Sequence, residues 1–427
     1  MLKLKSLIGL WLLFAFSVAA QPLSTLTLSD AYDMLEKQYP SLQDAGVLQQ
    51  IHQKDLDLLE IAKKPALSLK ADGRLQSESV SLKASDAMMV PFEINQPIIS
   101  VKSYVDAQYM IIDGGLNDVQ KKLKTVQLEA DLQNIKVEEY TLRQRINNLF
   151  VGISLLREQS KLFDISLENL RTRKERISAG IDQGVLLESE KTQIEVKELE
   201  LLAQKDNVSH QISGFVQSLA FLVGESLSEE ISLEFSSMPS PDQIPEIQRP
   251  EQQLFKLKRE AILARADLIE VESKPKLAAF AQAGVGYPNP LNLLDAGFSP
   301  YGMIGVQLNW RITDWKKGDS DRELLSLQAQ KLNHAEEAFD FNLKSREAFY
   351  LSEVERLRAQ IQNDEKIALL QTKILEQLTA QLDEGVITST EYIIQVNAEL
   401  AARQNLAIHQ TELLKTQLEF WNQRGGF

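Results

Sequence analysis

Three short patterns occur twice along the 427-residue chain, and this repetition limits the folds that the chain can adopt. In the first pattern, a proline is followed 25 residues later by a Pro-x-Leu sequence, and the second occurrence lies 210 residues after the first. In the other two patterns, an Asp close to glycine and a Gly-Val pair recur after 201 residues. The paired positions are Pro40 with Pro250, Pro65 with Pro275, Asp113 with Asp314, and Gly184 with Gly385. Their common order predicts an internal two-fold sequence repeat.

The repeat divides the chain into four segments. Residues 1–20 form a predicted signal peptide, and the first repeat covers 21–225 as a helix, two strands and a long helical hairpin. Residues 226–249 are rich in Ser and Glu and contain three prolines, which predicts a linker or equatorial segment between the copies. The second repeat covers 250–427 with the same order of parts.

The N-terminus predicts export across the inner membrane. Lys3 and Lys5 precede an apolar run from Leu7 to Phe16, and small residues at 18 and 20 suit cleavage after Ala20. A short membrane anchor is the alternative, but a spanning helix needs about 20 apolar residues. No later stretch is long and apolar enough, so any membrane-spanning part must consist of β-strands. Because the chain has no Cys, we expect no lipid anchor at its mature N-terminus.

Each copy is expected to contain long helices and two strands. Helices are predicted over roughly 28–63 and 250–273, over 114–183 and 316–383, and over 186–224 and 386–424. The strands are predicted at 66–78, 101–112, 276–287 and 300–313, where apolar and polar residues alternate. Polar or Pro/Gly-rich loops are predicted at about 79–100 and 288–299.

The strands suit a barrel that several chains build together. Strands of about ten residues match the height of an outer-membrane barrel. Four of them cannot close a barrel, whereas two chains supply eight strands and three supply twelve. The polar residues would line the lumen: Lys70, Asp72, Arg74, Asp106, Gln307, Asn309 and Arg311. The alternative that the pattern leaves open is a soluble β-sandwich with one wet face.

Together, the repeats, the Pro-x-Leu strand starts, the Asp turns and the Gly-Val hairpins resemble the TolC-type outer-membrane efflux family, also called outer membrane factors. The resemblance covers essentially the whole mature chain. It implies an α+β membrane protein, namely a homotrimer with a twelve-stranded β-barrel in outer-membrane lipid and a long periplasmic α-helical barrel. It also implies docking to a periplasmic adaptor (membrane fusion protein) that is linked to an inner-membrane pump of the RND or ABC type.

The hairpin tips are the expected docking and entrance sites. Residues that we expect to dock the adaptor lie at the two predicted helix–helix turns, namely Gly184, Val185, Leu186, Gly385, Val386 and Ile387. The alternative is that they only cap the hairpins. Four carboxylates are expected to line the periplasmic entrance, namely Glu190, Glu391, Asp383 and Glu384, and their alternative role is to solvate the hairpins. Family members usually carry Asp where this chain has Glu190 and Glu391, and Ile394 replaces a second acid of some members.

Composition argues against other function classes. The net charge of −14 disfavours binding of nucleic acid, and the four histidines have no metal-binding spacing. We therefore expect no cofactor, no metal and no enzymatic activity. The favoured function is a passive outer-membrane channel of a tripartite efflux or type I secretion system that exports small molecules or polypeptides. The alternative is a periplasmic coiled-coil scaffold without a pore, which would not need the four strands.

Overall fold

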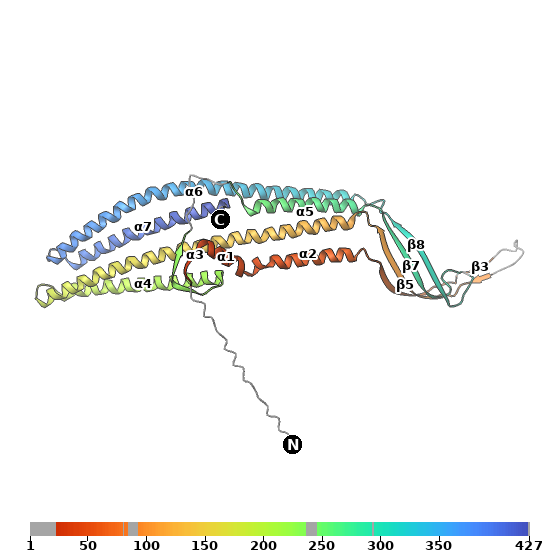
Figure 1. The fold of residues 1–427 in the computed structure, drawn as a ribbon, viewed down its shortest axis with the longest axis horizontal. Coiled ribbons are helices and arrows are strands. Elements are labelled where there is room, and N and C mark those ends of the chain that lie inside the picture. The colour runs from red at the N-terminus through yellow and green to blue at the C-terminus, as the bar shows by residue number, and fades with distance from the viewer. Residues whose placement is uncertain (1–22, 80, 84–92, 236–245, 293, 426–427) are drawn as a thin grey trace, which may run out of the picture. The chain divides into compact units, whose positions relative to one another are not determined.

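The computed structural model describes residues 23–79, 81–83, 93–235, 246–292 and 294–425 (Figure 1). The predicted signal peptide, residues 1–20, lies outside these residues. The chain forms two compact units, and segments from both halves of the sequence contribute to each. The first, which we call the hairpin unit, comprises the described residues within Met1–Tyr39, Leu142–Ile244 and Tyr350–Phe420. The second, the strand unit, comprises the described residues within Pro40–Thr141, Pro245–Phe349 and Trp421–Phe427.

The strand unit contains an antiparallel sheet of four long strands in the order β2-β5-β7-β8. These strands are β2 (Ala66–Leu75), β5 (Ile99–Ile112), β7 (Lys276–Tyr287) and β8 (Ser299–Asn309). Their positions agree with the four predicted strands except at the ends of β2 and β8, where the prediction was wrong because the strands stop at Leu75 and Asn309 and not at residues 78 and 313. The only neighbour of β8 within the sheet, β7, begins at Lys276 opposite Asn309, so residues 310–313 have no strand to pair with. Arg311 therefore lies beyond the sheet.

A short hairpin lies in the segment that was predicted as the loop 79–100. Strands β3 (Ser81–Lys83) and β4 (Glu93–Asn95) pair antiparallel, and residues 84–92 between them lie outside the described residues. The loop prediction was therefore wrong for these two short strands. Apolar and polar residues alternate within each of them, but three residues are too few for a periodicity to stand out in the sequence.

The helix predicted over 28–63 is two helices. The first, α1 (Leu28–Gln38), is followed by a 3-10 turn (Pro40–Gln43), and α2 (Asp44–Ile61) comes next. A proline disfavours helical geometry in the residue before it, and Tyr39 accordingly has extended backbone angles (φ −73°, ψ 122°). The corresponding helix of the second half, α5 (Pro250–Glu272), begins at its proline, where the missing N–H costs no helical hydrogen bond.

Two long helices pass through both units. These are α3 (Leu116–Asp182) and α6 (Lys317–Asp383), each 67 residues long. Each is followed by a helix of 36 residues, α4 (Glu188–Val223) or α7 (Ser389–Arg424), and the bounds agree with the predicted helices to within about three residues. A helix, two long strands, a 67-residue helix and a 36-residue helix thus follow in the same order in each half.

The core of the hairpin unit joins the two helical hairpins. Fully or largely buried side chains from α3, α4, α6 and α7 form one apolar cluster, including Leu170, Ile194, Leu201, Leu382 and Tyr392. Tyr392 is 1% exposed and belongs to the largest side chains of this core. The two hairpins are therefore held to each other by apolar packing as well as by polar contacts.

The segment 226–249, predicted as a linker, contains a strand. Strand β6 (Leu227–Glu234) pairs in parallel with β1 (Leu23–Thr27). Ile231 and Leu26 are 1% and 0% exposed, and burial of these side chains explains why a charged segment is ordered as a strand. Arg157 of α3 donates hydrogen bonds of 2.6 Å to the carbonyl oxygens of Ile231 and Glu229, which ties β6 to the long helix.

Candidate functional site

The register of the four-stranded sheet divides its side chains into two faces of different character. Residues directly opposite each other in neighbouring strands point to the same face. One such row across the sheet consists of Ser68, Asp106, Gln282 and Met303. Because side chains alternate between the faces along each strand, the register assigns every other residue of the four strands to one of the two faces. All charged residues of the four strands lie on the face that contains Asp106, which we call the polar face. The other, apolar face carries no charge.

Six of the seven predicted lumen residues lie on this polar face. They are Lys70, Asp72, Arg74, Asp106, Gln307 and Asn309. The seventh, Arg311, follows the last strand and has no place in the register. The apolar face presents large side chains that are half or more exposed in the single chain, and these are Leu67, Leu69, Leu75, Ile304, Val306 and Leu308. Such a face needs an apolar medium or another protein to cover it.

Asp106 is the centre of a polar network on the sheet. Its side chain is 1% exposed. It accepts hydrogen bonds from Lys70 Nζ at 2.6 Å, Gln282 Nε2 at 2.9 Å and Gln108 Nε2 at 2.9 Å. The network joins β2, β5 and β7, and it satisfies a carboxylate that would be costly to bury alone. Gln282 was not predicted as a site residue, because its importance depends on the pairing of two strands far apart in the sequence.

The two outer strands of the sheet leave open edges. β2 and β8 each have one neighbour in the sheet, and no further described strand covers their outer edges. Unpaired backbone groups along strands of 10 and 11 residues are a ready template for pairing with another chain. The sheet therefore has two edges at which a further strand could pair.

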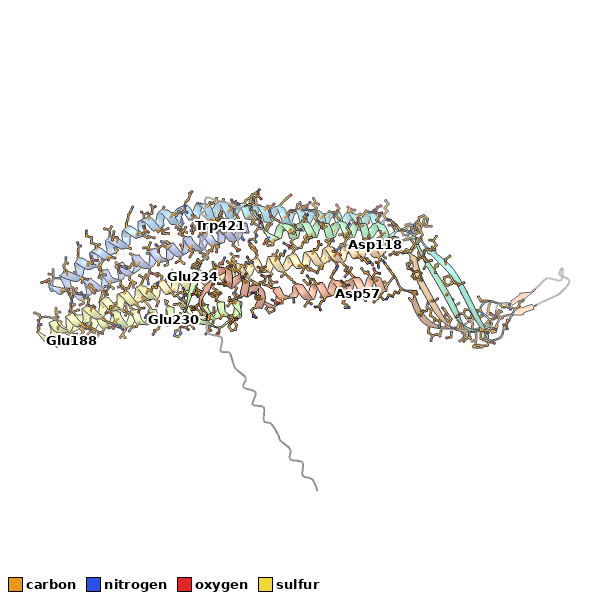
Figure 2. All side chains as sticks on the ribbon, in the orientation of Figure 1. Asp57, Asp118, Glu188, Glu230, Glu234 and Trp421 are labelled. Carbon is orange, nitrogen blue, oxygen red and sulfur yellow. The ribbon has the colours of Figure 1, made fainter. Side chains whose placement is uncertain are left out.

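The two hairpin tips have the same backbone design (Figure 2, where Glu188 is labelled at the α3–α4 tip). Gly184 and Gly385 have φ of +76° and +72°, which glycine adopts at little cost. Val185 N donates to Gly180 O at 3.0 Å and Val386 N to Gln381 O at 2.8 Å, the six-to-one bond of a Schellman motif. Both predicted helix–helix turns are thus confirmed as turns with left-handed glycines.

The apolar tip residues divide into exposed and packed groups. Val185 and Val386 are 73% and 70% exposed. Leu186 and Ile387 instead pack against the core cluster of the hairpin unit. Packing therefore accounts for one apolar residue of each tip, whereas docking of a partner by the exposed neighbour stays a prediction.

Two of the tip acids, Glu190 and Glu391, have structural partners. The backbone N–H of Ser389 donates to Glu190 Oε2 at 2.6 Å, so Glu190 of one hairpin caps the start of α7 in the other. Glu391 Oε2 accepts from the N–H of Thr388 at 2.9 Å, and the Thr388 hydroxyl accepts from Glu391 N at 3.4 Å, which is a capping box. Glu384 is exposed and has no side-chain partner among the described residues.

Asp383 is held by two arginines of α3. Arg173 and Arg176, one helical turn apart, each donate to one of its carboxylate oxygens. The Arg173 side chain is 10% exposed, so this contact is partly desolvated. The predicted entrance carboxylate Asp383 therefore also links the two hairpins. Neither arginine was predicted, although their spacing of three residues places both on one face of the helix.

Asp turns connect the sheet to the long helices in both halves. Asp113 accepts from the N–H groups of Gly115 and Asn117 at 2.9 and 3.0 Å. Asp314 accepts from those of Gly318 and Lys316 at 2.9 and 3.0 Å, and these bonds hold its pKa below the usual value. The two repeated aspartates thus start α3 and α6 in the same way.

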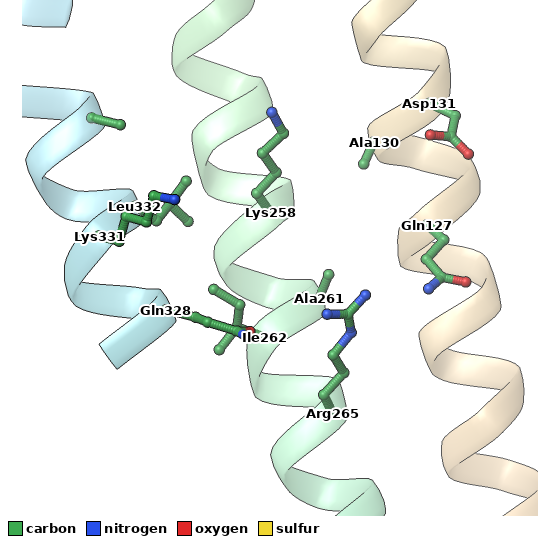
Figure 3. A pocket seen from close by; sticks show the side chains of 11 residues that line it. Gln127, Ala130, Asp131, Lys258, Ala261, Ile262, Arg265, Gln328, Lys331 and Leu332 are labelled. Carbon is green, nitrogen blue, oxygen red and sulfur yellow. The ribbon is translucent and has the colours of Figure 1, made fainter. Parts of the chain in front are cut away.

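A groove of about 550 Å³ lies between α3, α5 and α6 in the strand unit (Figure 3). Small and apolar residues form its floor, namely Ala130, Ala261, Ile262, Leu332 and Ala335. Lys258, Arg265 and Lys331 stand around it, and none of them has a carboxylate partner among the described residues. This surface was not predicted, because it combines residues from three separate helices.

No described helix is long and apolar enough to cross a lipid bilayer. No protein-family model matches the sequence, and a comparison with curated proteins finds no match. Solved structures do match. The outer membrane protein VceC from Vibrio cholerae is 15% identical, with a TM-score of 0.67, over 93% of this chain and 96% of VceC.

Two outer membrane channels are similar to the same degree. CmeC from Campylobacter jejuni is 14% identical, with a TM-score of 0.67, over 93% of this chain and 85% of CmeC. MtrE from Neisseria gonorrhoeae, solved in its open state, is 14% identical, with a TM-score of 0.65, over 93% of this chain and 89% of MtrE. The chain therefore has the fold of these outer-membrane channel proteins, which is the fold that the resemblance to the TolC-type family predicts.

Proposed function

We propose that the protein is a passive outer-membrane channel of a tripartite efflux or type I secretion system and has no enzymatic activity. The observation that carries the proposal is the division of the sheet: every charge of the four long strands lies on one face, and the opposite face is uncharged and exposed. A lipid-facing surface and a water-filled lumen require this division. The fold shared with CmeC and MtrE, both described as outer membrane channels, supports the same function.

The channel is a homotrimer in this proposal. Four strands with two open edges have to be completed by other copies, and three copies give a barrel of twelve strands with a lumen. The long helices add a second argument. On α6, large apolar side chains are exposed at nine positions, whereas Ile165 is the one such position on α3. A helix with an uncovered apolar face of this size is expected to pack against a neighbouring subunit. The polar residues Lys70, Asp72, Arg74, Asp106, Gln307 and Asn309 then line the lumen.

Conductance measurements test the proposal directly. The full-length protein, extracted from outer membranes in detergent, is expected to run as a heat-sensitive trimer and to form discrete pores in planar lipid bilayers. A stable monomer by mass measurement, without pores, would refute the proposal and would favour the alternative of a periplasmic scaffold. That alternative gives no reason for the apolar face of the sheet.

The exposed tip residues Val185 and Val386 dock a periplasmic adaptor, which connects the channel to an inner-membrane pump. Both side chains are more than two-thirds exposed beside packed neighbours, so they present apolar surface without carrying the hairpin core. The variant Val386→Asp is expected to abolish export while the amount of trimer stays normal. Ile387→Asp is the matched comparison, because it introduces the same charge at the packed neighbour and should reduce the trimer itself. Normal export by Val386→Asp would remove this residue from the docking surface.

The tip carboxylates contribute to an anionic entrance. Threefold symmetry would turn each inward-facing acid into a ring of three, which favours cations. Glu384 is the acid among the four whose side chain is exposed and without a partner, while Glu190, Glu391 and Asp383 also hold the hairpins together. The double variant Glu190→Gln/Glu391→Gln and the single variant Glu384→Gln should each reduce cation preference and block by multivalent cations. Unchanged selectivity and block in both would remove these acids from the constriction.

A further inference from the structure

The polar face of the sheet has a charge opposite in sign to that of the whole chain. Its six charged residues are Lys70, Asp72, Arg74, Lys102, Asp106 and Lys276. Four are cations and two are anions, so the face has a net charge of +2 (4 − 2), whereas the chain has −14. The excess of positive charge on this face is therefore a local feature and not a reflection of composition.

Ion pairing leaves two of the cations free. Lys70 Nζ lies 2.6 Å from Asp106 Oδ2, and Lys102 Nζ lies 3.4 Å from Asp72 Oδ2, so each carboxylate of the face is paired with a lysine. Arg74 and Lys276 have no carboxylate partner among the described residues. These two side chains carry the net charge of the face.

The free cations lie near opposite ends of the sheet. Arg74 is opposite Ser100 near the ends of β2 and β5 that are remote from the long helices, and Lys276 is opposite Asn309 where the strands meet the helices. The register places these two rows twelve residues apart. At about 3.3 Å per residue, they are roughly 40 Å apart along the strands. The paired charges lie between them.

We infer that this face makes the strand-lined section of the pathway attract anions, and that the exported substrates include small molecules with negative charge. The inference rests on the proposed channel function. In a threefold assembly, Arg74 and Lys276 become two rings of three cations, the arrangement that favours anions in pores. Walls of low dielectric constant strengthen the field of such rings. At physiological salt the field of a charge is screened beyond about 8 Å, so the field at this face is set mainly by the charges of the sheet itself.

Reversal potentials in a salt gradient test the inference. The purified full-length protein is reconstituted in planar bilayers with a tenfold KCl gradient, and the ratio of chloride to potassium permeability is measured. The double variant Arg74→Gln/Lys276→Gln is expected to lower this ratio by at least about threefold. The matched control, Asp72→Asn/Lys102→Gln, removes one charge of each sign from the same face and should leave the ratio unchanged. A variant that adds a cation to the face, Gln307→Lys, should raise the ratio, and it serves as the test if the double variant does not assemble.

The outcomes separate the two proposals. Pores whose permeability ratio is the same in the wild type, the double variant and Gln307→Lys would overturn the inference and leave the channel function intact. A wild-type protein that forms trimers but no pores would overturn the channel function, and the inference with it. An equal shift in the charge-neutral control would also overturn the inference, because the change would then follow from altered structure and not from net charge.

Discussion

Two adjacent residues in the middle of β8 provide a sharp test of which face of the sheet meets lipid. Ile304 lies five residues from each end of the strand, on the apolar face, and is 86% exposed in the single chain. Met303 precedes it on the polar face, directly opposite Gln282 of β7. We predict that Ile304→Arg strongly reduces assembly in the outer membrane and that Met303→Arg does not.

The magnitude follows from the position in the strand. Arginine facing lipid at the middle of the bilayer costs about 2–4 kcal/mol in each chain, a factor of roughly 30 to 1,000 in an equilibrium constant. Three chains per barrel raise the cost to roughly 6–12 kcal/mol, comparable to the whole stability of a typical domain. At Met303 the new guanidinium would instead face water on the polar face, in the same cross-strand row as Asp106 and two strands away from it.

The assay is the amount of heat-sensitive oligomer in the outer-membrane fraction, compared with total expressed protein. Ile304→Arg should yield almost no oligomer, whereas Met303→Arg should yield close to the wild-type amount. Equal yields from the two variants would refute the assignment of the faces. The reverse order would show that the polar face is covered by lipid or protein and that the barrel argument is wrong.

Three further predictions concern the hairpin unit and are checked by chemical or thermal unfolding in detergent. Gly184→Ala and Gly385→Ala should each lower the free energy of unfolding by only about 1 kcal/mol, because the strain comes from the positive φ alone and an added Cβ would meet no atom within 4 Å. A decrease of more than about 3 kcal/mol would contradict this expectation. Asp383→Asn should lower the free energy of unfolding by about 1–3 kcal/mol, because Arg173 and Arg176 of α3 lose the carboxylate that they share. An unchanged free energy of unfolding would show that the contact adds nothing to stability. The Lys174 ammonium holds the pKa of Glu198 below its usual value, so the stability that this pair adds is present above the unfolded-state pKa and disappears as the pH falls through the folded-state pKa. Glu198→Gln should therefore reduce the loss of stability that occurs below about pH 4.5. An unchanged dependence of stability on pH would contradict the pairing.

The sequence predicted most of the helices and strands because their ends carry strong local signals. Glycines with positive φ end α3 and α6 near the predicted residues, and Pro65 and Pro275 directly precede the first long strand of each half, β2 and β7. The break between α1 and α2 also has a local signal, Pro40, which was used to identify the repeat but not to end a helix. Period-two alternation gave the correct common face for six of the seven predicted lumen residues.

The features that were not predicted depend on contacts between distant segments. β6 is a strand because it pairs with β1, and residues 227–234 are too charged to suggest a buried strand by themselves. The contact of Asp383 with Arg173 joins residues 210 positions apart. Glu190 caps a helix in the other hairpin, so its partner is a backbone N–H that no sequence pattern identifies. The sequence showed that acids lie at the tips, but it could not show which of them already accept hydrogen bonds from other residues.

The pairing of β5 with β7 has a consequence for how the chain reaches its folded state. Asp106 and Gln282, which meet across these strands, are 176 residues apart in the sequence. In the proposed function the chain is exported, so β2 and β5 would leave the export machinery long before β7 can pair with β5, and β1 would leave it long before β6. Contacts of such long range form slowly, and apolar strands that wait for a partner are prone to aggregation. For a chain exported as proposed, we expect that a holding chaperone protects the first half until the second half has crossed the inner membrane. Truncation anywhere before Lys276 should then leave a product that cells degrade rather than a folded half.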